Sequence, residues 1–161
     1  MAGARHRLFN IPGMRIATSQ IVVRASLQME CVDLTEDLVR AVKDSGVTEG
    51  CSVAFCAHTT CNLFINELED GALADLQGRL DSLIPSRIYY AHDDLERRTQ
   101  NLVPDERSNG RSHVIQMVLG GTSQTIPVSS GELVLGRWQR LLLLELDEPK
   151  DRTCVFQVWG R

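Results

Sequence analysis

The chain has 161 residues, of which 43% are hydrophobic and 24% charged, and its formal net charge is −4. This length favours one domain with its own hydrophobic core. The slight negative charge argues against a general affinity for nucleic acid or for anionic membranes, and no apolar run approaches the roughly 20 residues that a membrane span needs.

The N-terminal residues carry Arg5, His6 and Arg7 with no apolar run behind them. An ordinary secretory signal is therefore not expected, and we expect a cytoplasmic protein. Residues 1–13 are predicted to be an extension that precedes one domain over residues 14–161. The five cysteines are odd in number and include no CxxC pair, so we expect buried thiols rather than a disulfide framework.

Two segments have the periodicity of amphipathic helices. The first follows Asp33, which has the spacing of an N-cap residue with Glu36, and Gly46 is expected to end it. The second covers residues 68–84, and Pro85 stops it.

Most of the remaining sequence predicts strands. Their segments are rich in β-branched and apolar residues, and Gly120–Gly121 and Gly131 predict tight hairpins between the later ones. The predicted strands are residues 15–28, 50–57, 61–66, 113–119, 122–128, 132–135, 138–146 and 153–158. Two main helices and a strand-rich remainder predict an α+β domain with a mostly antiparallel or mixed sheet. Residues 91–111 form a long polar loop, which is disordered or functional.

Three histidines stand where apolar sequence meets polar sequence. His58 follows a predicted strand and precedes Thr59 and Thr60, His92 precedes two aspartates, and His113 opens a predicted strand. Three imidazoles with an open fourth position form one geometry of catalytic zinc. The sequence leaves open the alternative that each is a structural histidine at a strand end.

Asn66 and Glu67 follow the strand after the threonine pair. Glu67 is a candidate general base or carboxylate ligand, or alternatively a carboxylate favoured by the dipole of the next helix. An anionic substrate needs cations, and the sequence does not choose among four arginines. These are Arg87, Arg97, Arg98 and Arg111.

The order of several motifs resembles the YjbQ-like family, also called the secondary thiamine-phosphate synthase family. Residues 50–67 contain His-Thr-Thr followed by Ile-Asn-Glu, and residues 123–139 contain two spaced glycines followed by Trp-Gln. Tyr90-Ala-His92 and Ser112-His113 fall between them in the family's order. The resemblance covers about residues 14–160.

This resemblance implies an α+β domain assembled as a homotrimer, with sites near the subunit boundaries. It implies that His58, His92 and His113 line one pocket, which takes a divalent metal ion (zinc or magnesium) or a sulfate-like anion. We therefore predict His58, Glu67 and His113 as catalytic residues. The predicted substrate-binding residues are Thr59, Thr60, Asn66, Arg111, Ser112 and Gln139.

The chain departs from the family's pattern at two places. Arg137 replaces the threonine of Gly-Thr-Trp-Gln, and the segment before His113 lacks an aspartate that relatives often have. The activity attached to the family is weak thiamine-phosphate synthesis, in which a thiazole phosphate displaces pyrophosphate from a pyrimidine diphosphate. Two alternatives stay open: metal-assisted hydrolysis of a small phosphorylated or acyl substrate with Glu67 as base, and a non-catalytic trimer that binds a small anionic ligand.

Overall fold

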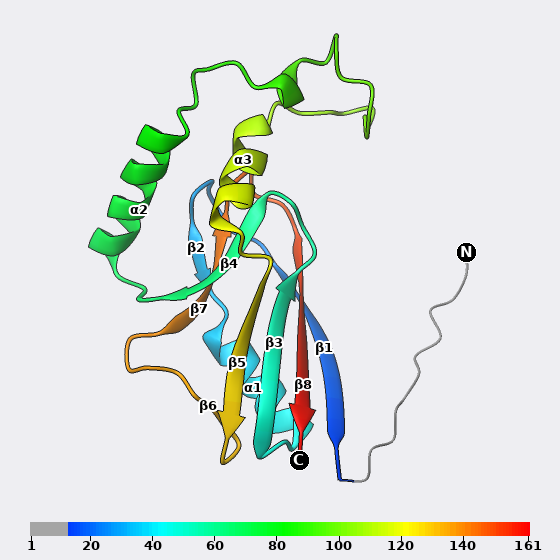
Figure 1. Cartoon of the computed structure of the whole chain (residues 1–161), viewed down its shortest axis with the longest axis vertical. Helices are drawn as coiled ribbons and strands as arrows, with labels where there is room; N and C mark the ends of the chain where they lie inside the picture. The colour runs from blue at the N-terminus through cyan, green and yellow to red at the C-terminus, as the bar shows by residue number, and fades with distance from the viewer. Residues whose placement is uncertain (1–12) are drawn as a thin grey trace.

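Two antiparallel sheets form the framework of the chain in the computed structural model, which describes residues 13–161 (Figure 1). The larger sheet has the strand order β1-β8-β3-β5-β6 and the smaller one the order β2-β7-β4. The strands of the larger sheet are β1 (Arg15–Val23), β8 (Arg152–Gly160), β3 (Glu49–Cys56), β5 (Ser123–Ser129) and β6 (Glu132–Leu133). Those of the smaller sheet are β2 (Cys31–Asp33), β7 (Arg140–Glu145) and β4 (Cys61–Asn66). The predicted extension lies outside the described residues except for Gly13.

The core lies between one face of the larger sheet, the smaller sheet and helix α1 (Thr35–Ser45). Leu38 of α1 is fully buried together with Ala54 and Phe156 of the larger sheet. β7 is the central strand of the smaller sheet, and its leucine run, residues 141–144, is at most 1% exposed. Cys56, Cys61 and Cys154 are buried, as expected for thiols that pack as small apolar residues.

Both predicted helices form. The N-cap of α1 is Leu34 and not the predicted Asp33, which precedes it. Asp33 Oδ1 accepts a hydrogen bond from the Thr35 N–H at 2.8 Å at the start of α1, and Gly46 ends the helix with a left-handed φ of 64°. Helix α2 (Asp70–Leu83) starts after Glu69, whose carboxylate accepts from the N–H groups of Gly71 and Ala72. Of the residues of α2, Leu80 alone is buried, and the helix lies to one side of the sheets (Figure 1).

A third helix, α3 (Gly110–Leu119), replaces the strand predicted over residues 113–119. That prediction was wrong because it relied on the β-branched residues of the segment. The buried residues Ser112 and Ile115 and the partly buried Leu119 recur at helical spacing. Gly120 has a left-handed φ of 69° and ends this helix, so it does not form the predicted hairpin. The hairpin predicted at Gly131 does form, between β5 and β6.

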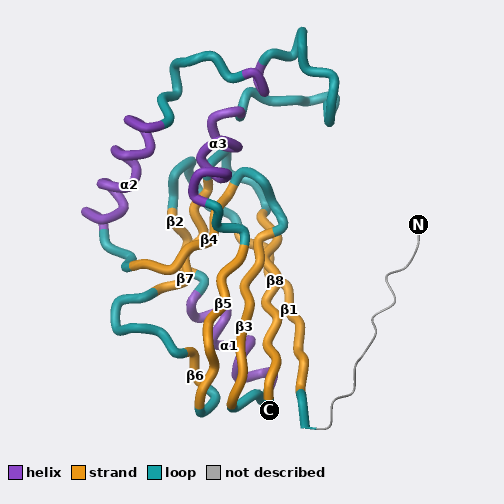
Figure 2. Tube along the Cα trace, viewed as in Figure 1, coloured by secondary structure: helices purple, strands orange, loops and turns teal. Residues whose placement is uncertain are grey.

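The connection from α2 to α3 reaches beyond the end of the sheets where α3 begins (Figure 2). It contains a short 3-10 turn, η1 (Ala91–Asp93). The Gly110 N–H, at the start of α3, donates to Asp93 Oδ1 at 2.8 Å. This bond ties the start of α3 to η1, so the long polar segment is ordered around the helix. No helix in the described part of the chain is long and apolar enough to cross a membrane.

A buried ion pair joins the end of β7 to the start of β8. The side chains of Glu145 and Arg152 are 0% and 2% exposed, and Arg152 Nε donates to Glu145 Oε2 at 2.7 Å. A second arginine nitrogen donates to the other carboxylate oxygen and, at 3.2 Å, to the Thr60 carbonyl. The Asp147 N–H also donates to Glu145, at 3.0 Å. The pair therefore connects β7, β8 and the β3–β4 connection.

Replacement of Glu145 by glutamine leaves the Arg152 cation buried without its counter-charge. We expect this variant to lose about 3–5 kcal/mol of unfolding free energy in a denaturant titration. The control is Asp151→Asn, which removes the exposed pair with Arg24, whose side chains are 60% and 68% exposed; we expect it to cost about 0–1 kcal/mol. A similar, small loss for both variants would show that the buried pair is not a structural requirement.

Candidate active site

His58 is held in the β3–β4 connection as a hydrogen-bond acceptor. Its Nε2 accepts a hydrogen bond from the Thr153 N–H at 2.9 Å. An imidazole nitrogen that accepts carries no proton, so the neutral ring has its proton on Nδ1. Burial, followed by the charge of Arg152, lowers the pKa of His58 below its usual value. His58 is therefore a neutral imidazole at neutral pH.

His92 and His113 lie against each other. His92 belongs to η1 and His113 to α3, and their ring centroids are 4.4 Å apart with an angle of 52° between the planes. Burial lowers the pKa of His113, and so does the neighbouring His92. The protonated form of His113 is therefore disfavoured in this position.

A short chain of hydrogen bonds fixes the orientation of His92. Asn109 Nδ2 donates to Asp147 Oδ2 at 3.0 Å, which places the Asn109 oxygen toward His92 Nε2, also at 3.0 Å. Arg98 Nη1 lies 3.2 Å from the same nitrogen, so an acceptor and a donor both face His92 Nε2. Lys150 also donates to Asp147, at 2.7 Å. Burial alone would raise the pKa of Asp147, but the bonds from Lys150 and Asn109 lower it.

Arg98 organises the loop on the other side of His92. Its guanidinium pairs with Glu106 at 2.6 Å, and these side chains are 13% and 14% exposed. It also donates to the backbone carbonyls of His92, Gln100 and Asn101, at 3.1–3.3 Å. The hydrogen bond from Arg98 lowers the pKa of Glu106. Arg98 Nη1 also lies 3.2 Å from His92 Nε2, so the guanidinium is engaged by the loop and by the His92 ring.

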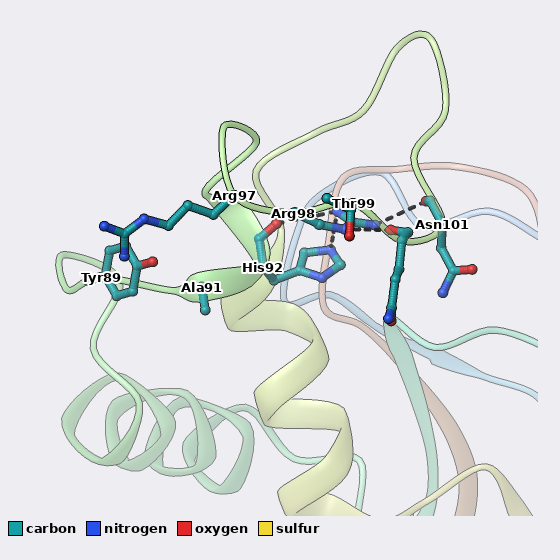
Figure 3. Close-up of a pocket in the computed structure, with 8 residues that line it drawn as sticks. Tyr89, Ala91, His92, Arg97, Arg98, Thr99 and Asn101 are labelled. Atoms are coloured by element: carbon teal, nitrogen blue, oxygen red, sulfur yellow. Dashed lines mark hydrogen bonds between the residues drawn. The ribbon is translucent and has the colours of Figure 1, made fainter.

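A pocket of about 600 Å³ opens beside His92 (Figure 3). The lining residues are Tyr89, Ala91, His92, Arg97, Arg98, Thr99, Gln100 and Asn101. Figure 3 shows Arg97 extended over Tyr89, with the His92 ring and Arg98 at the other end of the pocket. The side chain of Arg97 is 82% exposed and has one long ion pair, 3.6 Å to Asp94. Of the two arginines in this pocket, Arg97 is therefore the one available to an anionic ligand.

Several predicted substrate-binding residues hold the structure around this site instead of lining the pocket. Ser112 Oγ donates to the Leu146 carbonyl at 2.6 Å, and the Thr60 carbonyl accepts from Arg152. The Arg111 guanidinium donates to the Ile84 carbonyl at 2.8 Å and pairs with Asp81, which ties α3 to α2. Thr59 is exposed next to His58.

Asn66, Glu67 and Gln139 lie at the far end of the smaller sheet. In its register Cys61 is opposite Glu145 and Asn66 is opposite Arg140, so a strand of six residues, about 17 Å, separates these residues from the His58 end. Gln139 Oε1 accepts from the Gly136 N–H at 2.8 Å. A single chain does not bring these three residues to the histidines.

The residues described here do not form a three-ligand metal site. Among residues 13–161, no three His, Cys, Asp or Glu side chains are close enough to hold one ion, and His58 already uses Nε2 as an acceptor. A single chain thus does not fit the tetrahedral ligand set that zinc requires. Zinc or magnesium stays a prediction.

Sequence reasoning missed Asn109 and Asp147, which lie at the histidine pair, and Lys150, which donates to Asp147. Asp147 gives the site a carboxylate of the kind that the segment before His113 lacks, although it comes from a distant part of the chain. One signal was present in the sequence: Glu145 and Asp147 interrupt the strongly apolar end of β7. Charged side chains next to a buried strand are seldom tolerated without partners.

Asp147 stabilises the charged form of His113, so Asp147→Asn should lower the pKa of His113 further. Titration of the histidine Cε1–H signals by NMR measures this change directly. The control Asp151→Asn removes an exposed carboxylate and should leave the pKa of His113 unchanged. If the pKa of His113 rises, or moves equally in both variants, the proposed neighbourhood of His113 is incorrect.

The chain matches known proteins over most of its length. The family described as UPF0047 protein YjbQ-like matches residues 19–161. A UPF0047 protein of Methanothermobacter thermautotrophicus is 32% identical over 148 residues, covering 92% of this chain and 95% of the relative. One of Archaeoglobus fulgidus is 33% identical over 139 residues, covering 86% and 98%. The names of these relatives state no reaction, substrate or cofactor.

Solved structures agree with the fold. The crystal structure of a YbjQ-like protein of unknown function from Sulfolobus solfataricus has a TM-score of 0.78 and 30% identity, and covers 92% of this chain and 99% of that one. A structure of a yjbq/upf0047 family protein from Clostridium acetobutylicum has a TM-score of 0.70 and 28% identity, with coverage of 87% and 98%. The sequence match and the shared architecture lead to one assignment. The chain belongs to the YjbQ-like UPF0047 family.

Proposed function

We propose that the chain is an acid–base enzyme that acts on a small phosphorylated substrate in the pocket beside His92. The observation that supports this most is the His92–His113 pair, with ring centroids 4.4 Å apart and with His92 held by Asn109, which Asp147 orients. An imidazole can accept a proton in one step and return it in another.

The electrostatics of the pocket support an anionic substrate. Arg97 is an exposed cation at one end, and His92 is at the other (Figure 3). A substrate whose phosphate pairs with Arg97 would place its reacting end near His92. The volume of about 600 Å³ is within the range of small-molecule sites.

The reaction class that fits is one with a phosphate or pyrophosphate leaving group. In the thiamine-phosphate reaction that the resemblance suggested, a bond forms to the pyrimidine methylene carbon and the carbon–oxygen bond to pyrophosphate breaks. A protonated imidazole would donate its proton to the departing oxygen, while the second imidazole stays neutral. Because the described residues of one chain assemble no three-ligand metal site, no step is assigned to a metal ion.

Glutamine variants of the two histidines test the chemistry. His92→Gln and His113→Gln should each lower kcat by about 10²–10⁴-fold on the thiazole phosphate and pyrimidine diphosphate pair, or on another phosphorylated substrate that the protein turns over. Arg97→Ala should instead raise KM about ten-fold with little change in kcat, since it removes a contact made throughout the reaction. Arg40, an exposed arginine of α1, provides the control as Arg40→Ala. Unchanged kcat in both histidine variants, or no turnover of any phosphorylated compound in the panel, would contradict an enzyme of this type.

We further propose that the domain works as a homotrimer, and the outer face of the larger sheet supports self-association. The register places Ile16, Trp159 and Cys51 side by side, and Val155 beside Phe55, on the face opposite the core. Ile16 and Phe55 are 50% and 42% exposed. Apolar side chains gathered on one sheet face are typical of an interaction surface. The leucine run of β7 is buried and is not available to such a surface.

The trimer would also explain why Asn66, Glu67 and Gln139 lie far from the histidines of their own chain. Phe55→Lys places a charge on this face next to Val155 and should convert trimer to monomer in sedimentation equilibrium at micromolar concentration. Asp44→Lys, at an exposed position of α1 away from this face, serves as the control. A monomer for the unaltered protein would refute the trimer.

A further inference from the structure

A second pocket lies between β4, α2 and α3 and shares no lining residue with the pocket beside His92. Its volume is about 240 Å³. Apolar side chains form most of its wall: Phe64, Ala72, Leu73, Leu76 and Leu119. Leu63 contributes its backbone, since its side chain is buried in the core. Asn66 and Glu67 also contribute, as do the backbones of Gly120 and Gly121. The space is therefore apolar around its sides and acidic at one place.

Asn62 is the buried polar group of this pocket, with 2% exposure. Its Oδ1 accepts a hydrogen bond from the Gly121 N–H at 2.8 Å, which fixes the orientation of the amide. Asn62 Nδ2 has no hydrogen-bond partner among residues 13–161. Every fully enclosed side-chain nitrogen and oxygen in that range has a partner, so Nδ2 is not fully enclosed. The NH₂ group therefore faces accessible space, and the pocket is the space that Asn62 lines.

Gln124 places an acceptor in the same pocket. Its Nε2 donates to the Leu63 carbonyl at 2.9 Å, so the Oε1 end stays free. The Leu63 N–H in turn donates to the Gly121 carbonyl at 2.6 Å. Both amides are thus anchored to the same short contact between β4 and the end of α3. A Cβ at Gly121 would lie 2.2 Å from the Leu63 carbonyl oxygen, so only glycine permits this approach.

We propose that this pocket binds a small, uncharged ring compound with a carboxamide edge. The ligand's carbonyl would accept from Asn62 Nδ2, and its N–H would donate to Gln124 Oε1. The pocket volume is smaller than that of sites for drug-sized ligands, which limits the ligand to about one ring. The Glu67 carboxylate disfavours an anion. Binding here is independent of the function proposed above, because the pocket beside His92 selects for a negatively charged ligand.

Benzamide is the probe, since it joins one ring to a primary carboxamide. In ¹H–¹⁵N correlation spectra of the full-length protein we expect saturable shifts of the Asn62 side-chain amide and of the Gly120 and Gly121 N–H signals. Saturation should occur in the millimolar range, as is usual for a fragment of this size. Benzoate has the same shape with a charge and no donor, and it should bind at least about ten-fold more weakly.

Two variants locate the binding. Asn62→Asp keeps the acceptor for the Gly121 N–H and replaces the donor, so benzamide affinity should fall at least about ten-fold. Ala72→Leu fills the pocket from its wall and should abolish the shifts, and it keeps the test valid if Asn62→Asp does not fold. Ala74→Leu, on the exposed side of the same helix, is the matched control. No saturable binding of benzamide, or equal binding by the Ala72→Leu and Ala74→Leu variants, would overturn the proposal.

Discussion

The buried pair of Glu145 and Arg152 is the constraint on which the site depends. Removing two charges from water is costly, and an ion pair offsets that cost only when further hydrogen bonds satisfy both groups. Glu145 receives such bonds from Arg152 and from the Asp147 N–H, and Arg152 also reaches the Thr60 carbonyl. These bonds fix the end of β7, the start of β8 and the β3–β4 connection relative to one another without a ligand.

The polar groups of the site are neighbours of this pair along the chain. Thr153, next to Arg152, presents its N–H to His58. Leu146, next to Glu145, presents its carbonyl to Ser112 of α3. Asp147 follows and holds Asn109, which orients His92. The strand ends thus supply a rigid base, while the loop around Arg98 supplies the open side of the pocket.

The sequence predicted the parts whose causes are local. The α+β class, both amphipathic helices, the C-cap at Gly46 and the turn at Gly131 follow from periodicity and from glycine conformations that the structure confirms. Helix α3 was not predicted, because its segment is rich in β-branched residues. The burial of Ile115 and the contact with η1 at its start favour the helix, and both depend on distant parts of the fold. The His92–His113 contact depends on how a long loop folds back, which residue spacing does not encode.

Replacing the pair by apolar residues of similar size tests its role most directly. A buried ion pair can be exchanged for Glu145→Leu and Arg152→Met without loss of the fold, so the effect on His58 can be observed in a folded protein. The histidine ring ¹⁵N spectrum reports the tautomer and the pKa of His58. We predict that His58 loses its fixed Nδ1–H tautomer and that its pKa rises slightly, because Arg152 lowers this pKa by more than Glu145 raises it. A His58 spectrum and titration identical to those of the unaltered protein would contradict the view that the pair positions this site.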